Sequence, residues 1–329
     1  LTPEDIYHLS KLAIMEYLTS GITANADMYL TPDTMIEASR DCGYRTTVIG
    51  AVNNFTQSVE LLDEWYKKYH KKENLINFEL GFHAEYTTKK EILEGIADLA
   101  EKYKAPVYTH NSESESEVAQ CIERTKVTPT VYMDRLGIFN YGGGFYHCVH
   151  MTQNDLDIVK EHNISVITNP ASNLKLASGI APINHMLKEG INLAIGTDGP
   201  ASNNCLDMFR EMFLVTALAK YRENDASAVD ALEVLKMATI GGAKAMNLTD
   251  CDVLAEGKEA DIIMIDLNQP NMQPIHNIQK NLVYSGSKQN VKLTMVAGKI
   301  LYENGEFFIG TDAYKIYEKA NDIAERIVK

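Results

Sequence analysis

Short apolar stretches alternate with amphipathic helical patterns along most of the chain, and this alternation limits the folds that the sequence can adopt. Seven stretches have the length and composition of β-strands. They are GITANADMY from Gly21, YRTTVIGAV from Tyr44, INFELGFHAE from Ile76, APVYTHNSE from Ala105, GGGFYHCVH from Gly142, ISVITNPAS from Ile164 and INLAIGTDG from Ile191. Strand–helix alternation predicts a parallel sheet, and a long series of such units closes into a (β/α)8 barrel. The expected fold class is therefore α/β, with a TIM-type barrel.

The strand count is one short of a complete barrel. The chain opens with a helical pattern, TPEDIYHLSKLAIMEYL, which no strand pattern precedes. We therefore expect the first barrel strand to lie upstream of Leu1, and a barrel with a gap is the alternative. Helix starts are indicated by Thr2 and Thr31, each followed by proline, and by capping-box patterns that begin at Thr88 and Thr152.

The composition excludes several classes of partner. The 329 residues are 45% hydrophobic, which is enough for a full core, and the formal net charge is −14. Nucleic acids and anionic membranes require a basic surface, so neither is an expected partner. The five cysteines are scattered and odd in number, which is typical of a reducing compartment. With no signal-peptide pattern at the start, we predict a cytoplasmic protein, and homo-oligomerisation stays open.

Six of the seven predicted strands end near a polar side chain. In barrels of this kind the carboxyl ends of the strands form the active-site face. The six residues are Asp27, His83, His110, His147, Asn169 and Asp198. A single histidine in such a place is more often a hydrogen-bonded structural group, but six polar residues at equivalent places favour one shared site. Imidazole and carboxylate groups are normal ligands of zinc or iron, so metal-assisted hydrolysis is the chemistry indicated.

Two stretches leave alternatives open. In HNSESESEV, which begins at His110, Glu113 either faces the same reaction as the histidine or belongs to a solvated acidic helix start. In FYHCVH, a regular strand would turn His147 and His150 to opposite faces, one toward the barrel interior and one toward the outer layer. The residues alone do not decide which histidine faces inward.

Five blocks of the sequence resemble the amidohydrolase superfamily. They are DMY at Asp27, HNSE at His110, HCVH at His147, NPASNLKLASGIAP at Asn169 and GTDGPASNNCLDMFREM at Gly196. The branch that the chain most resembles contains the deaminases of S-adenosylhomocysteine, methylthioadenosine and guanine, with related chlorohydrolases. The resemblance extends over nearly the whole chain and implies a barrel followed by a small β domain.

The resemblance also implies roles for individual residues. His110 and Asp198 match metal ligands, and Asp198 is also matched with the group that takes a proton from the attacking water. Glu113 matches a glutamate that shuttles protons, which leaves Glu115 and Glu117 as a solvated helix face. His147 matches the histidine that polarises the attacked centre. Substrate contacts are implied for His83, His147 and Asn169.

The chain departs from the family pattern in three places. The His-x-His pair that supplies two metal ligands in the family occurs nowhere in the sequence, which agrees with the expectation that a first strand lies upstream. The family segment around His83 carries glycine and proline that are missing from GFHAEY, which begins at Gly81. Thr168 stands where many relatives have histidine.

The last part of the chain predicts a separate unit. CDVLAEGKEADIIMIDL from Cys251 resembles a strand pair of the family, and Asn304-Gly305 favours a type I′ hairpin turn. The final residues form an amphipathic pattern. We therefore predict a hydrolase barrel over 1–250, a small β domain over 251–310 and a C-terminal helix over 311–329.

These observations predict a metal-dependent hydrolytic deaminase. The expected substrate is a small aminated heterocycle (an adenosine-type nucleoside, guanine or a related ring), which is attacked by hydroxide generated at the metal and releases ammonia. One divalent ion is expected as cofactor, with zinc ahead of iron. The alternatives are a ligand-binding barrel that is inactive because the His-x-His pair is absent, and an amidohydrolase of another cyclic amide or chlorinated ring. A dinucleotide-binding protein is disfavoured because no predicted strand is followed by G-x-G-x-x-G.

Overall fold

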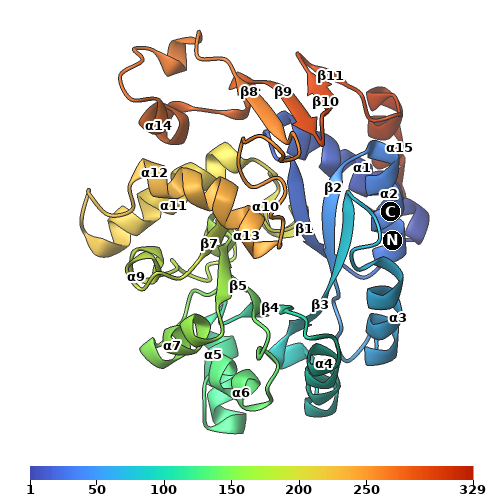
Figure 1. Cartoon of the computed structure of the whole chain (residues 1–329), viewed down its shortest axis with the longest axis vertical. Helices are drawn as coiled ribbons and strands as arrows, with labels where there is room; N and C mark the ends of the chain where they lie inside the picture. The colour runs from blue at the N-terminus through green and yellow to red at the C-terminus, as the bar shows by residue number, and fades with distance from the viewer. Residues whose placement is uncertain (329) are drawn as a thin grey trace.

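A parallel sheet of seven strands forms the centre of the molecule in the computed structural model, which describes residues 1–328 (Figure 1). The strands are β1 (Ala24–Met28), β2 (Arg45–Ile49), β3 (Ile76–Ala84), β4 (Val107–Asn111), β5 (Gly143–His147), β6 (Ile164–Thr168) and β7 (Leu193–Ile195). They lie side by side in chain order, and every neighbouring pair is parallel. All seven predicted strands are therefore confirmed. The expectation that a further strand lies upstream stays a prediction.

Helices surround the curled sheet, as Figure 1 shows. They are α1 (Pro3–Thr19), α2 (Pro32–Cys42), α3 (Val59–Tyr69), α4 (Lys90–Tyr103), α5 (Glu115–Thr125), α6 (Pro129–Arg135), α7 (Gln153–Glu161), α8 (Pro170–Lys175), α9 (Ile183–Lys188), α10 (Pro200–Asn203), α11 (Met208–Glu223), α12 (Ala231–Lys236) and α13 (Gly242–Ala245). Strands and helices alternate as the sequence predicts, and the α/β barrel architecture is confirmed.

The helix starts follow the sequence signals with one exception. Thr152 forms the predicted capping box at α7. Thr2 and Thr31 precede α1 and α2 with proline at the first helical position, as predicted, and Thr2 also forms a capping box. The capping box predicted at Thr88 is wrong. Helix α4 begins after Lys89, because the Thr88 hydroxyl donates instead to the carbonyl of Ala84, 2.8 Å away, at the end of β3.

Two layers of apolar side chains hold the barrel together. The outward-facing side chains of each strand, such as Phe78 and Phe82 of β3, pack with the helices in the main core. Inside the barrel, a second cluster joins Ile49, Tyr108 and Ile167. Because both faces of the sheet are apolar, polar side chains collect at the carboxyl ends of the strands.

A four-stranded antiparallel sheet lies beside the barrel, at the top of Figure 1, in the order β11-β10-β9-β8. Its strands are β8 (Ile262–Ile265), β9 (Val291–Val296), β10 (Lys299–Glu303) and β11 (Glu306–Phe307). Asn304 and Gly305 both have positive φ, 48° and 94°, between β10 and β11. The predicted type I′ turn and the small β domain are therefore confirmed, whereas the residue limits of the domains stay predictions.

Ion pairs tie the small sheet and the last helix to the barrel. Arg45 at the start of β2 is 4% exposed, and its guanidinium donates to Asp261, just before β8, at 2.9 and 3.0 Å. Helix α15 (Ala313–Val328) packs along α1, where Arg326 pairs with Asp5 at 2.5 Å. This confirms the predicted terminal helix except for Lys329, which lies outside the described residues.

Two further findings concern membrane-spanning helices and the cysteines. Among the helices of residues 1–328, none is both long and apolar enough to span a bilayer. The cysteines are all free, and three of them (Cys42, Cys121 and Cys148) are buried. The expectation of a cytoplasmic location stays a prediction.

Glu79, in the middle of β3, is a buried carboxyl group away from the strand ends. It is 1% exposed, and its Oε1 accepts from the side-chain amide of Asn77 at 2.9 Å. Its Oε2 has no hydrogen-bond partner among the described residues, and the nearest basic atom, Nδ1 of His70 at 3.6 Å, already bonds the carbonyl of Phe78. Burial raises the pKa of Glu79 to about 7 from the ordinary value of 4.5.

We therefore predict that Glu79→Gln stabilises the fold at alkaline pH. Ionising a buried carboxyl whose pKa is raised on folding lowers the free energy of unfolding. For Glu79 this loss grows as the pH rises from 4.5 to 7 and is complete above 7. Glutamine does not ionise and should raise the free energy of unfolding at pH 8 by up to about 3 kcal/mol, with much less gain at pH 5. Urea unfolding at the two pH values measures this, with Glu64→Gln on the surface of α3 as control. Equal effects of Glu79→Gln at both pH values would contradict the prediction.

Candidate active site

Three histidines from neighbouring strands meet at the carboxyl edge of the sheet. His83 lies near the end of β3, His110 on β4 and His147 at the end of β5. The ring centroids of His83 and His110 are 5.0 Å apart, and those of His110 and His147 are 5.5 Å apart. Parallel pairing places these strand ends next to one another, so the grouping that the sequence predicts is present.

In each histidine, Nδ1 forms a hydrogen bond to a neighbouring oxygen that can act only as the acceptor. Nδ1 of His110 donates to the backbone carbonyl of His83 at 2.6 Å, and Nδ1 of His147 donates to Oδ1 of Asn173 at 2.7 Å. Nδ1 of His83 donates to the Thr87 hydroxyl at 2.9 Å, because that hydroxyl gives its own proton to Ala84. Each ring therefore keeps Nε2 available for a metal ion or a substrate.

His110 and His83 favour the neutral form. Burial, together with the nearby rings of His147 and His83, lowers the pKa of His110 from the ordinary value of 6.5 to about 3. Burial is also the main cause that lowers the pKa of His83, while the charge of Glu113 acts in the opposite direction. A neutral imidazole is the form that binds a metal ion, so His110 is ready for this role at neutral pH.

Two carboxylates converge on one atom of this group. Oε2 of Glu113 lies 3.7 Å from Nε2 of His147, and Oδ2 of Asp198 lies 3.9 Å from the same nitrogen. The side-chain amide of Asn169 lies 3.5 Å from it as well. His147 itself is 1% exposed, whereas the side chains of Glu113 and Asp198 are 21% and 20% exposed. Glu113, Asp198 and Asn169 thus join the histidines as the sequence predicts.

Asp198 lies just beyond β7 in an unusual backbone conformation. Its φ is +57°, which is uncommon for a residue with a side chain. Its two carboxylate oxygens are held separately, because Ser172 donates to Oδ2 at 2.5 Å and the backbone N–H of Gly199 donates to Oδ1 at 2.6 Å. These bonds fix the direction in which the carboxylate points.

Asp27 does not belong to the group. It pairs in register with Val48, whose side chain lies in the outer core, whereas the next residue, Met28, pairs with Ile49 of the inner cluster. Its hydrogen-bond neighbour is Asn25 at 3.5 Å. The expectation that Asp27 shares the site was wrong. It considered only how close Asp27 lies to the end of the strand and not which face of the sheet its side chain occupies.

The choice between His147 and His150 is decided by the end of the strand. β5 stops at His147, where φ is +71°, and Cys148 follows with φ +51°. The regular alternation predicted for FYHCVH therefore breaks, and His150 does not face the outer layer. Its Nε2 donates to the carbonyl of Ser178 at 2.7 Å, so His150 holds the loop that follows α8.

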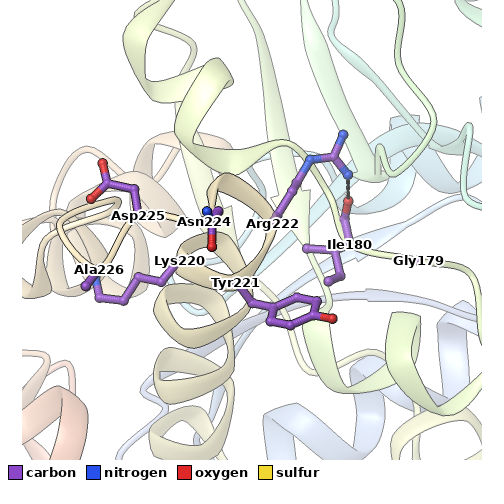
Figure 2. A pocket seen from close by; sticks show the side chains of 8 residues that line it. All are labelled: Gly179, Ile180, Lys220, Tyr221, Arg222, Asn224, Asp225 and Ala226. Carbon is purple, nitrogen blue, oxygen red and sulfur yellow. Dashed lines mark hydrogen bonds between the residues drawn. The ribbon is translucent and has the colours of Figure 1, made fainter.

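That loop, residues 177–181, crosses the site. The Ser178 hydroxyl donates to Oε1 of Glu113 at 3.2 Å, which links the loop to Glu113. On the outer side, Arg222 of α11 donates to the carbonyl of Ile180, as the dashed line in Figure 2 shows. The surface hollow drawn there is lined by Gly179, Ile180, Lys220, Tyr221, Arg222, Asn224, Asp225 and Ala226. It lies behind the loop and away from the histidines.

Glu117 has a different role from the one that the sequence predicts. It is 5% exposed, and its carboxylate accepts the backbone N–H groups of Ser112 at 2.9 Å and Glu113 at 2.8 Å. With Ser114 it forms a capping box at the start of α5. Glu117 therefore fixes the turn that carries Glu113. The spacing Ser114-x-x-Glu117 was the available signal, and the serine–glutamate alternation concealed it. Glu115 is exposed, as predicted.

The donor set fits a metal ion in part. The two candidate ligands are Nε2 of His110 and the carboxylate of Asp198. The negative charge of Asp198 raises the pKa of His110 slightly against the effect of burial, so the two side chains interact. Within residues 1–328, no group of three or more histidine, cysteine, aspartate or glutamate side chains is arranged to hold a metal ion. A catalytic zinc usually has three protein ligands, so the described residues supply two candidates of such a set.

Comparison with known proteins agrees with this geometry. The model of the amidohydrolase family matches residues 1–301. A 5-methylthioadenosine/S-adenosylhomocysteine deaminase from Caldanaerobacter subterraneus is 37% identical over 337 residues, covering 100% of this chain and 78% of its own. A 5′-deoxyadenosine deaminase from Methanopyrus kandleri is 35% identical over 96% of this chain and 74% of its own. The crystal structure of an adenosine deaminase from Xanthomonas campestris with bound zinc has a TM-score of 0.95 and 32% identity, covering 99% of this chain and 76% of its own.

The buried position of Glu117 leads to a stability prediction. In Glu117→Gln an amide NH2 replaces one carboxylate oxygen, so one backbone N–H of the Ser112–Ser114 turn loses its acceptor. A buried donor without a partner costs about 1–3 kcal/mol, and urea unfolding at pH 7 should show a loss of this size. Glu115→Gln, in the same helical turn but exposed, should stay within about 0.5 kcal/mol of the native protein. If the two variants had similar free energies of unfolding, Glu117 would be a solvated residue of the helix face, as the sequence predicts.

Proposed function

The chain belongs to the amidohydrolase family, and from this premise we propose that it hydrolyses the exocyclic carbon–nitrogen bond of an adenosine-type nucleoside or a related aminated heterocycle, with release of ammonia. Its relatives include deaminases of that class, and it is a hydrolase acting on carbon–nitrogen bonds. The observation that carries the proposal is the approach of Glu113 and Asp198 to the same nitrogen of His147.

The cofactor would be one divalent ion. His110, through Nε2, and Asp198 would hold it, and zinc is the first choice because the Xanthomonas relative contains zinc, with iron as the alternative. When bound, such an ion lowers the pKa of a bound water toward neutrality and so supplies hydroxide at pH 7. The neutral state of His110 supports this assignment.

The remaining steps are proton transfers between groups of this chain and the substrate. Asp198 would take a proton from the attacking water, since its carboxylate is held in place by Ser172 and Gly199. Glu113 would take up the other proton of that water and give it to the ring nitrogen next to the attacked carbon, and it would then relay the proton held by Asp198 to the departing amine, which leaves as ammonia. The hydrogen bond from Ser178 holds Glu113 in position for both transfers.

His147 would stabilise the charge that develops at the attacked centre. Its Nδ1 is held by Asn173, so the ring cannot turn, and a proton at Nε2 would lie between two carboxylates. His83 and Asn169 would contact the substrate from the two sides of this junction. His83 is half-buried and His147 is fully buried.

An ammonia-release screen tests the proposed function. The protein loaded with zinc should release ammonia from one or more of a set of aminated purine nucleosides, purines, pyrimidines and triazines. Chelation of the metal should abolish the release, and added zinc should restore it. Binding of these compounds without any release from the loaded protein would favour the alternative of a ligand-binding barrel.

We predict that Glu113→Gln removes most of the turnover but not the fold. Glutamine keeps the size and the hydrogen bond to Ser178 but cannot shuttle protons, so kcat should fall on the order of 10²–10⁴-fold. Steady-state kinetics on the best substrate of the screen measures the change, with circular dichroism as a check on folding. Glu115→Gln serves as the control, because Glu115 is exposed and should turn over normally. A kcat for Glu113→Gln close to that of the native protein would remove Glu113 from the mechanism.

A further inference from the structure

Two short segments orient the side chains at the centre of the site. Helix α8 carries Ser172, which donates to Oδ2 of Asp198. The next residue of α8, Asn173, accepts the bond from Nδ1 of His147. The turn after β7 carries Asp198 itself, and Gly199 in that turn donates to Oδ1 of the same carboxylate. The position of the Asp198 carboxylate relative to the His147 ring therefore depends on how α8 and this turn are fixed to each other.

Glu211, on α11, holds both segments with one carboxylate. The residue is fully buried, at 0% exposure. Its Oε2 accepts the backbone N–H of Ala171, in the first turn of α8, at 3.0 Å. Its Oε1 accepts the side-chain amide of Asn203, the last residue of α10, at 2.8 Å. A single side chain of a third helix thus bridges α8 and α10.

Asn203 extends this bridge to the turn that carries Asp198. Its side-chain amide also donates to the carbonyl of Thr197 at 2.7 Å, and Thr197 directly precedes Asp198 in the chain. The backbone N–H of Asn203 donates to the carbonyl of Gly199, which directly follows Asp198, at 3.0 Å. Asn203 therefore bonds the residues on both sides of Asp198, while Glu211 fixes the orientation of its amide.

Stability alone would not favour a carboxylate at this place. Burial raises the pKa of Glu211 to about 7 from the ordinary value of 4.5, and the bonds from Ala171 and Asn203 act in the opposite direction. A glutamine of the same shape would avoid the cost of burying a charge, but it has one oxygen and could accept from only one of the two donors. A carboxylate is required because both segments present a donor to the same side chain.

We propose that Glu211 is a positioning residue for the reaction, which places the Asp198 carboxylate and the His147 ring by bridging Ala171 and Asn203. The inference rests on the function proposed above. Glu211 bonds neither Asp198 nor His147 directly, so it acts through α8 and through Asn203. Groups that hold a metal ligand in place typically change metal affinity or activity by about 10–100-fold when they are replaced.

The test is Glu211→Gln, which keeps the size of the side chain. In this variant an amide NH2 replaces one oxygen and faces the N–H of either Ala171 or Asn203, so one of the two segments loses its bond. The Kd for zinc, measured by competition with a chromophoric chelator, should rise by about tenfold or more, and kcat should fall by a similar factor. Circular dichroism checks that the variant is folded.

Glu79→Gln is the matched control. Glu79 is also a buried carboxyl, 1% exposed and with a pKa raised to about 7, but it lies in the middle of β3 away from the strand ends. The same substitution there should leave the Kd for zinc and kcat within about twofold of the native values, because distant sites act independently.

A second variant covers the case in which Glu211→Gln does not fold. Asn203→Ala removes the bond to the carbonyl of Thr197 and leaves the bond between Ala171 and Glu211. It should weaken zinc binding in the same direction as Glu211→Gln.

Four outcomes decide the inference. A Kd for zinc in Glu211→Gln within about twofold of the native value, or an equal loss in Glu79→Gln, would overturn the positioning role. A native protein that bound neither zinc nor iron would overturn it together with the proposed cofactor, because Asp198 would then hold no metal ion. A weaker zinc affinity in Glu211→Gln would support the role even if the native protein released no ammonia in the screen, which bears only on the proposed function.

Discussion

Parallel pairing of β3, β4 and β5 is the constraint on which the rest of the site depends. It brings the ends of three successive strands to one edge, with Ala84 opposite His110 and Asn111 opposite His147. The hydrogen bond from His110 to the carbonyl of His83 crosses the same edge and orients one ring by the backbone of the neighbouring strand. The geometry of the histidines is thus a property of the sheet and not of flexible loops.

The groups that surround the histidines are held in strained or buried positions by polar side chains beneath them. Ser112 follows β4, His147 ends β5 and Asp198 lies beyond β7, with φ of +52°, +71° and +57°. Such conformations cost about 1–3 kcal/mol each for residues with side chains. Glu117 holds the turn at Ser112, and Asn173 holds His147. The strain lies at the points where a strand must end abruptly to present a side chain to the reaction.

Burial acts in opposite ways on the titratable groups of the barrel. It lowers the pKa of His110 and raises that of Glu79, since in both cases the charged form loses its hydration. For the histidine this loss is useful, because the neutral ring is the form that binds a metal ion. For Glu79 it is a cost in stability, which Asn77, Lys71 and Asn247 offset in part.

The sequence by itself determined the seven strands, the small antiparallel sheet with its Asn304-Gly305 turn and most members of the site, because apolar periodicity and turn chemistry are local properties. The contacts that hold these members in place join segments far apart in the chain, such as Ser178 to Glu113 and Asn173 to His147, and no local pattern reports them. Asp27 was misplaced because the face of a strand depends on its register with its neighbour, and His150 because β5 ends before the alternation reaches it. Which side chains share a site was therefore readable from strand ends, whereas their orientation and their support were decided only by tertiary packing.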